Sequence, residues 1–246
     1  MAHDDGYFDE RVAATFDRDY DYQNDPTVVG PMVDLLAGLA GDGRALELGS
    51  GTGRIALPLA ARGVPVHGIE LSRPMTARLH AKPGGEGIGV TIGDFSTARA
   101  DGTFSLAYLV ANTIMNLTTQ AAQVDCFRNV ARHLVPGGRF VIEVGVPGLQ
   151  RLPVGERFQV FDATAGHWGI DEYDVANQGL ISHHFRPVDG GLERRSITFR
   201  YVWPAELDLM AELAGMKLRE RWAGWKREPF TSDSRGHVSV WEKPGS

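Results

Sequence analysis

The feature that most constrains this chain is a glycine-rich turn at residues 47–53, which read Glu-Leu-Gly-Ser-Gly-Thr-Gly. A short apolar run at 44–49 leads into it, and a helix is expected at 54–62. Glycine lets the backbone turn tightly and approach a ligand without a Cβ in the way. A free helix N-terminus presents unpaired N–H groups that suit a carboxylate or phosphate. The pattern predicts a strand, a ligand-binding turn and a helix, as found where α/β folds bind ligands at the carboxyl ends of their strands.

Strand and helix patterns alternate through the first 145 residues. Apolar runs such as 104–110 are typical of parallel strands that are buried on both faces. Strands alternating with helices form right-handed βαβ units. We therefore expect a Rossmann-like, doubly wound α/β fold. The expected strands are 44–49, 64–70, 88–93, 104–110 and 139–144, and the expected helices are 27–40, 54–62, a helix beginning near Ser72, and 118–134.

The pattern changes after the fifth strand, where four segments alternate apolar and polar residues. This alternation predicts an antiparallel β-meander inserted into the α/β fold. The α/β pattern then returns with a helix that starts at Pro204, and two more strands complete a seven-stranded, mostly parallel sheet. The meander strands are expected at 158–163, 167–175, 179–187 and 192–202, and the last two strands of the core at 216–222 and 237–243.

The chain accordingly divides into four parts. The first, residues 1–26, is acidic and carries five aromatic residues. It is either a partly solvated leader or a lid whose aromatic rings fold over a ligand. The other parts are a ligand-binding α/β core at 27–150, the β insertion at 151–203, and the last helix and two strands at 204–246. The five aromatic residues are Tyr7, Phe8, Phe16, Tyr20 and Tyr22.

Composition narrows the classes of partner. The net charge of −6 argues against a protein whose affinity comes from neutralising phosphates, so we expect no nucleic-acid partner. The single cysteine, Cys126, permits no disulfide within the chain, which matches a reducing compartment. The N-terminus has no apolar run like that of a signal peptide, and no stretch is long and apolar enough to span a membrane. We expect a cytoplasmic protein without a membrane partner.

The spacing of the glycines separates two classes of nucleotide site. Dinucleotide-binding proteins carry glycine at the first, third and sixth positions, but here the sixth position is Arg54 and the fifth is Gly53. The observed spacing resembles motif I of the class I S-adenosylmethionine-dependent methyltransferases, in which the acidic residue before the glycines meets the amino group of the methionine. Glu47 stands in that place. An NAD-linked oxidoreductase remains the alternative.

The resemblance continues beyond the glycine turn. Glu70 lies 21 residues after Gly49 at the end of a strand, where a carboxylate accepts both ribose hydroxyls of either cofactor. An Asp94 that accepts from the adenine amino group, beside the ring of Phe95, matches the next motif of the methyltransferases. The resemblance implies S-adenosylmethionine as the cofactor. Its expected binding residues are Glu47, Gly49, Ser50, Gly51, Gly53, Glu70, Leu71, Met75, Asp94, Phe95, Val110 and Ala111.

The segment 112–120, the β insertion and the length of the chain resemble bacterial small-molecule methyltransferases of secondary metabolism, amino-sugar N-methyltransferases in particular. The Asn/Asp-Pro-Pro-aromatic motif of enzymes that methylate exocyclic amides is absent after residue 110. Cys126 falls in the middle of a predicted helix, so it reads as a buried small apolar residue rather than a nucleophile. Only Asp94 and Glu143 lie near the expected edge of the sheet, so we expect no metal ion.

Candidates for the acceptor site follow the strands. Asn112 and Asn116 follow the fourth strand, Glu143 ends the fifth, and Tyr22 belongs to the expected lid. The loop at 225–235 opens on the same edge, which brings Phe230, Ser232 and Arg235 within expected reach. His183 and His184 are adjacent on one predicted strand, so only one of them can face the site.

These observations predict metal-free methyl transfer to a small molecule, with an amine nitrogen as the expected acceptor. An O- or C-methyltransferase and a non-catalytic cofactor-binding protein remain open alternatives. One face of the meander is left without a cover, and burial against a second copy would make the protein a homodimer.

Overall fold

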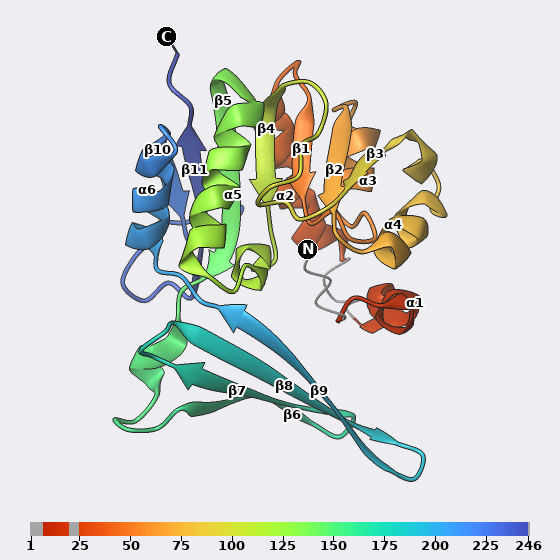
Figure 1. The fold of residues 1–246 in the computed structure, drawn as a ribbon, viewed down its shortest axis with the longest axis vertical. Helices are drawn as coiled ribbons and strands as arrows, with labels where there is room; N and C mark the ends of the chain where they lie inside the picture. The colour runs from red at the N-terminus through yellow and green to blue at the C-terminus, as the bar shows by residue number, and fades with distance from the viewer. Residues whose placement is uncertain (1–6, 20–24, 246) are drawn as a thin grey trace.

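The computed structural model describes residues 7–19 and 25–245 and contains two β-sheets (Figure 1). The larger sheet has seven strands in the order β10-β11-β5-β4-β1-β2-β3, and the smaller has four in the order β6-β7-β8-β9. In the larger sheet, β1 to β5 pair in parallel and β11 is antiparallel to both of its neighbours. The predicted Rossmann-like α/β fold with an antiparallel meander after the fifth strand is confirmed.

The strand bounds follow the predicted segments closely. Those of the larger sheet are β1 (Ala45–Leu48), β2 (Val66–Glu70), β3 (Gly89–Ile92), β4 (Phe104–Leu109), β5 (Leu134–Gly145), β10 (Lys217–Trp222) and β11 (Gly236–Glu242). Those of the meander are β6 (Phe158–Thr164), β7 (His167–Asp174), β8 (Gly179–Val188) and β9 (Gly191–Arg200).

β5 is longer than expected. It begins at Leu134 and passes through the Pro-Gly-Gly turn, which we expected to precede the strand. The turn belongs to the sheet because its backbone pairs with the end of the chain: Gly137 N donates to Lys243 O at 2.7 Å, and Lys243 N donates to Gly138 O at 2.9 Å. β4 pairs on both sides of the turn, with a shift of register between Phe104 and Leu106.

Helices cover both faces of the larger sheet (Figure 1). α2 (Pro26–Ala40) and α3 (Ala56–Ala61) pack on one face, and α5 (Gln120–His133) and α6 (Pro204–Leu213) on the other. Four helices begin at a side chain that accepts a backbone N–H, as an N-cap requires: Asp9 for α1 (Glu10–Asp19), Asp25 for α2, Ser72 for α4 (Arg73–His80) and Thr119 for α5. Short 3-10 helices lie at Gly85–Gly87, Thr113–Asn116 and Gly148–Arg151.

The apolar core lies between α5, α6 and the sheet. Phe127 of α5 packs edge-on against Phe140 and Trp241, at ring distances of 5.1 and 5.4 Å. Cys126 is fully buried in the same cluster, as expected for a small apolar residue. No helix in the described part of the chain is both long and apolar enough to cross a lipid bilayer.

The topology places a ligand site at one edge of the larger sheet. β1 pairs with β2 on one side and with β4 on the other, so the strand order reverses between β1 and β4. Ligands of doubly wound folds bind at such a point, beyond the carboxyl ends of the strands. The meander leaves the core at the same edge, after β5 (Figure 1).

A buried polar network attaches the meander to the core. Arg200, at the end of β9, donates to Glu206 of α6 at 2.7 Å and to Gln123 of α5 at 2.5 Å. The guanidinium is buried, and burying a charge is tolerated when it is paired and hydrogen-bonded. The network therefore fixes where the meander leaves the core, and with it the position of the meander below the sheet edge.

Candidate active site

The glycine turn adopts a backbone that other residues rarely take. Gly49, Gly51 and Gly53 have φ angles of +71°, +52° and +85°. A Cβ on Gly49 would also lie 2.8 Å from the side chain of Thr113. The turn requires glycine at these positions, because the left-handed region and the close approach both exclude a side chain.

Glu70 holds the turn against the end of β2. Its Oε2 accepts from Gly51 N at 2.8 Å, and its Oε1 accepts from Ser72 N at 2.7 Å. Both distances are those of hydrogen bonds to a charged acceptor. The carboxylate is thereby fixed beside the turn, at the start of α4.

Glu47, in the strand that leads into the glycine turn, has a buried carboxyl. It is only 3% exposed, and its Oε2 has no hydrogen-bond partner among the residues that the structure describes. Burial raises the pKa of this carboxyl from 4.5 to about 8, against the opposing influence of Tyr108 and Arg54. A buried carboxyl with one oxygen lacking a hydrogen bond is costly when ionised, so this one is suited to a cationic partner.

A small cavity of about 130 Å³ opens beside the turn. Six of the predicted cofactor residues line it: Gly49, Gly51, Glu70, Leu71, Met75 and Phe95. Six others are not among its lining residues: Glu47, Ser50, Gly53, Asp94, Val110 and Ala111. Asp94 instead accepts from Ser96 N at 2.8 Å in the turn after β3, and Val110 is buried at the end of β4.

A larger cavity of about 480 Å³ lies between the sheet edge and the meander. The two cavities share four lining residues: Phe8, Phe16, Thr113 and Asn116. The meander contributes aromatic and aliphatic side chains together with Asp171, Ser182 and His184. The two cavities therefore adjoin, and the larger one has mixed apolar and polar walls.

The residues after β4 form a strained turn in the wall of the larger cavity. Ala111 and Asn112 have φ angles of 56° and 61°, a region that few residues other than glycine adopt. Asn112 Oδ1 accepts from Gly145 N at 2.6 Å, and Glu143 Oε2 accepts from Ala111 N at 2.6 Å. Strain of this kind gathers at functional sites, where the surrounding structure enforces it.

Three of the predicted catalytic residues can be placed. Asn112 and Asn116 line the larger cavity, whereas Glu143 does not and instead holds the backbone of Ala111. Tyr22, the fourth candidate, and Tyr20 lie outside the described residues.

The expectation for the loop at 225–235 stays a prediction. Phe230, Ser232 and Arg235 are not among the residues that line the two cavities. The ring of Phe230 packs on His237 at a ring distance of 5.7 Å. Arg235 lies beside the larger cavity, because its backbone O accepts from the N–H of Val146, a lining residue, at 2.9 Å.

The N-terminal segment covers the place where the cavities meet. Phe8 and Phe16 line both cavities, and Tyr7 lines the larger one. α1 (Glu10–Asp19) is held to the glycine turn through Asp17, which accepts from Thr52 Oγ1 at 2.5 Å and pairs with Lys82 at 2.7 Å.

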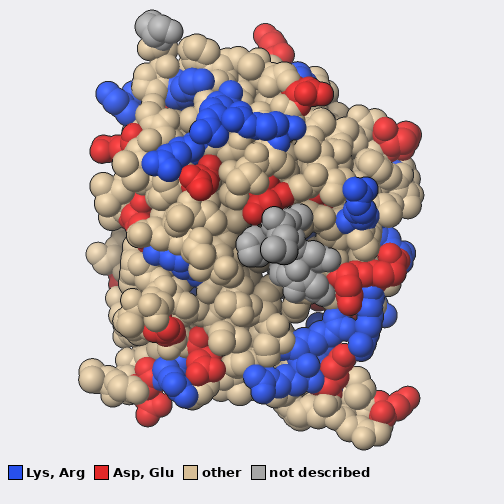
Figure 2. All heavy atoms as spheres, viewed as in Figure 1, with Lys and Arg blue, Asp and Glu red and all other residues tan. Residues whose placement is uncertain are grey.

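Ion pairs also connect α1 to the meander. Arg11 pairs with Glu193 of β9 at 2.5 Å, and Arg186 of β8 pairs with Asp19 at 3.3 Å. Figure 2 shows a group of Lys and Arg side chains between α1 and the far end of the meander. α1 thus contacts both the core and the meander.

Only one of the two adjacent histidines faces the site, as predicted. His184 lines the larger cavity, whereas His183 lies on the opposite face of β8, where it contacts Ser196 and Glu172. We did not identify Asp171 or Ser182 from the sequence. Strand alternation places Ser182 on the same face as His184, so the period of two was the signal for it.

Among the described residues, no group of three or more His, Cys, Asp or Glu side chains is arranged to hold a metal ion.

Known proteins are similar to this chain in sequence and in fold. Residues 45–138 match a family described as a methyltransferase domain. The cypemycin N-terminal methyltransferase of a Streptomyces species is 30% identical over 216 residues, which cover 82% of this chain and 84% of that protein. The CcbJ methyltransferase from Streptomyces caelestis is 37% identical and superposes with a TM-score of 0.79, over 87% of this chain and 89% of the other.

A more distant structure has the same fold. The S-adenosylmethionine-bound CalS10, an amino pentose methyltransferase from Micromonospora echinaspora, superposes with a TM-score of 0.67 at 21% identity. The superposition covers 92% of this chain and 96% of that one. Sequence identity along most of the chain, the matched domain and the shared fold agree: the chain belongs to the class I S-adenosylmethionine-dependent methyltransferases.

Proposed function

We propose that this enzyme methylates an amine nitrogen of a small molecule. The observation that carries the proposal is the pair of adjoining cavities, one beside the glycine turn and the other between the sheet edge and the meander. The first suits the cofactor and the second an acceptor. Their shared wall allows a donor in one cavity to meet an acceptor in the other, and holding the two in the right orientation contributes about 7–11 kcal/mol in favourable cases.

The residues around the small cavity fit S-adenosylmethionine. Glu70 in the cavity wall suits the ribose hydroxyls, and the buried carboxyl of Glu47 in the strand below the turn, with Oε2 lacking a hydrogen bond, suits the ammonium of the methionine part. Leu71, Met75 and Phe95 offer apolar contacts to the adenine. The cofactor supplies a methyl group that its sulfonium already activates. All twelve assignments to the cofactor remain predictions, and those of Ser50, Gly53, Asp94, Val110 and Ala111 are not supported by the lining of the small cavity.

The ionisable groups of the larger cavity favour an amine over a hydroxyl. A hydroxyl acceptor needs a base to remove its proton, whereas an amine needs only to be neutral when it attacks. Burial lowers the pKa of His184 to about 4, so its ring is a weak base. Burial raises the pKa of Tyr173 to about 12, so its phenol stays protonated. We infer that these side chains accept and donate hydrogen bonds rather than activate a hydroxyl.

The name of the cypemycin relative also supports an amine rather than a hydroxyl acceptor. The cypemycin enzyme is named as an N-terminal methyltransferase, and so acts on an amine nitrogen. In this chain, the carboxylate of Asp171 in the cavity wall can pair with a cationic group of the acceptor. The amides of Asn112 and Asn116 can orient polar groups of the acceptor where the two cavities meet.

The N-terminal segment would act as a lid. Its aromatic side chains lie over the place where the cavities meet, and polar contacts hold it on both sides. A closed lid excludes water, which strengthens the electrostatic interactions within the site.

A panel of acceptors tests the proposal. The purified enzyme is incubated with S-adenosylmethionine and with primary and secondary amines, amino sugars, and alcohols and phenols of matched shape. S-adenosylhomocysteine is measured together with the mass of each acceptor. We expect methylated amines and unchanged hydroxyl analogues. Methylation of phenols or alcohols in preference to amines would contradict the proposal, as would cofactor binding without transfer to any amine.

A further inference from the structure

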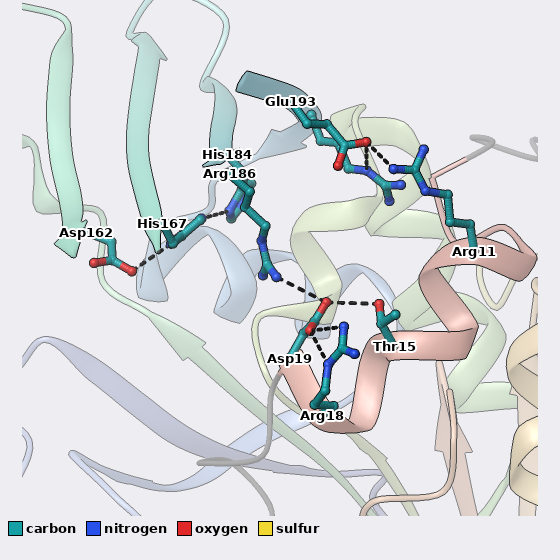
Figure 3. Close-up of polar contacts among 10 residues, drawn as sticks. Arg11, Thr15, Arg18, Asp19, Asp162, His167, His184, Arg186 and Glu193 are labelled. Carbon is teal, nitrogen blue, oxygen red and sulfur yellow. Dashed lines mark hydrogen bonds and ion pairs between the residues drawn. The ribbon is translucent and has the colours of Figure 1, made fainter. Parts of the chain in front are cut away.

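A chain of three polar side chains runs through the meander to the wall of the larger cavity (Figure 3). His167 Nδ1 lies 2.7 Å from Asp162 Oδ2, and His167 Nε2 lies 2.9 Å from His184 Nδ1. The two imidazole planes are only 24° apart, which favours a hydrogen bond in the plane of the rings. The residues come from three successive strands: β6, β7 and β8.

Asp162, at one end of this hydrogen-bonded series, determines which atoms donate and which accept along it. The hydrogen bond from His167 lowers the pKa of Asp162, so the carboxylate is ionised and can only accept. A neutral His167 that donates to this carboxylate carries its proton on Nδ1, and its Nε2 then accepts from Nδ1–H of His184. In neutral imidazole only one nitrogen carries a proton. His184 therefore presents a lone pair at Nε2.

The surroundings of His184 keep this lone pair available. Its ring lines the larger cavity and packs edge-on against Phe161 at 5.4 Å. Ser182 Oγ lies 3.4 Å from Nε2, but its hydroxyl also interacts with Asp171, whose pKa is raised by burial against the opposing effect of this hydrogen bond. Burial lowers the pKa of His184, and the nearby positive charge of Arg186 lowers it further. The ring is accordingly neutral near pH 7.

The other charged groups that face this ring are few. His183 flanks it on β8, Asp162 lies beyond His167, and Asp171 shares the cavity wall. Arg195 is the cross-strand partner of His184 on β9. The carboxylate of Asp162 favours protonation of the His184 ring, but burial and the neighbouring cation Arg186 oppose it more strongly.

We propose that Asp162, His167 and His184 form a chain that aims the Nε2 lone pair of His184 at the N–H of the acceptor amine. His184 is the catalytic residue of this chain, and the other two are positioning residues. The inference rests on the proposed amine methylation and names the side chain that accepts a hydrogen bond from the amine to be methylated.

The chemistry balances without a further reactant. The lone pair of the acceptor nitrogen forms the new N–C bond, and the bond from that carbon to sulfur breaks with both electrons going to sulfur. Positive charge thereby moves to the nitrogen, whose N–H donates to His184 Nε2. Asp162 stabilises this charge through the two rings, and the ammonium proton later leaves to solvent. Preorganised hydrogen-bond partners of this kind typically contribute 10²–10³ in rate.

The first test measures the tautomers directly in the full-length protein without an acceptor. We expect ¹⁵N chemical shifts at pH 7 to show His184 neutral and protonated on Nδ1. In Asp162→Asn the new amide can donate to His167, which reverses the chain and moves the proton of His184 to Nε2. Asp189→Asn, an exposed residue in the turn between β8 and β9, is the matched control. A His184 that is charged, or protonated on Nε2 in the wild type, overturns the proposal.

The second test uses an amine that the panel shows to be methylated. We expect His184→Asn to lower kcat about 100-fold with little change in affinity for S-adenosylhomocysteine, and Asp162→Asn to lower kcat by a similar factor. His183→Asn, on the same strand but on the other face, should keep wild-type kcat. Equal losses of kcat in His183→Asn and His184→Asn would mean that Asp162, His167 and His184 have only a structural role, and would overturn the proposal.

The two hypotheses fail in different ways. If no amine is methylated, the proposed function fails and the acceptor role of His184 fails with it. If amines are methylated but His184 is charged or protonated on Nε2, or His184→Asn retains wild-type kcat, only the proposed role of Asp162, His167 and His184 fails. Asp162 is about one-third exposed, so Asp162→Asn should fold even if His184→Asn does not.

Discussion

Glu47 should lower the stability of the free enzyme, and replacing it by glutamine should therefore raise stability while weakening cofactor binding. Its carboxyl is buried and its Oε2 has no partner among the described residues. A folded-state pKa above the unfolded value means that the folded state holds a proton that the unfolded state releases. The free energy of unfolding then falls as pH rises between the two pKa values.

The size of the effect follows from the pKa. Burial raises it from 4.5 to about 8, and each pKa unit corresponds to about 1.4 kcal/mol. The contribution is small at pH 5 and reaches roughly 3 kcal/mol at pH 7 and 4 kcal/mol at pH 8. Glu47→Gln removes the ionisable group, so this pH-dependent cost disappears. For a chain of this size, a gain of about 3 kcal/mol raises Tm by roughly 6–12 °C.

Thermal unfolding of the wild type and Glu47→Gln between pH 5 and pH 8 provides the assay. We expect the difference in Tm to widen steadily with pH. Glu86→Gln, which removes an exposed carboxylate near α4, is the control and should show no such trend. Calorimetry should show affinity for S-adenosylhomocysteine falling about 10- to 100-fold in Glu47→Gln, because a charged hydrogen bond contributes about 1.5–3 kcal/mol. A difference in Tm that does not change with pH would refute the reasoning.

Four further predictions concern other parts of the molecule. Gly51→Val should abolish measurable cofactor binding in calorimetry, since φ of +52° excludes a β-branched residue. Asn112→Ala should lower unfolding free energy by about 1–2 kcal/mol and slow methyl transfer, because a hydrogen bond to the end of β5 is lost. Cys126 should react with a thiol reagent only on unfolding, since burial raises its pKa. The exposed apolar side chains of β6 and β7 should make a homodimer, and sedimentation showing only a 26.8 kDa species would contradict this.

The fold was predictable because its signals are local. Continuous apolar runs identify the parallel strands, alternation identifies the meander, and the glycines at 49, 51 and 53 identify a turn that only this backbone can make. Each of these signals depends on residues within about ten positions of one another. The fold class followed from their order along the chain.

The acceptor side was less predictable because it depends on packing between distant segments. The direction in which His184 points depends on where β9 and α6 anchor the meander, through Arg200. Glu143 ends a strand at the correct edge, yet its carboxylate is engaged by the backbone of Ala111. Phe230 lies on a loop that opens on the same edge, yet its ring packs on His237 and lines neither cavity. Sequence identifies the edge of the sheet, but only the assembled fold determines which side chains reach the cavity.

Two unfavourable features meet where the strand order reverses. β1 carries a buried carboxyl at Glu47, its second-to-last residue, and the strained pair Ala111 and Asn112 follows the end of β4. Strained residues of this kind typically cost 1–3 kcal/mol each. Neither feature contributes to packing, so the well-packed sheet on either side must hold them in place. A bound cation beside Glu47 would allow the carboxyl to ionise and so remove its cost, which makes cofactor binding a stabilising event at this point of the fold. The low stability of the free site is thus a consequence of its complementarity to the cofactor.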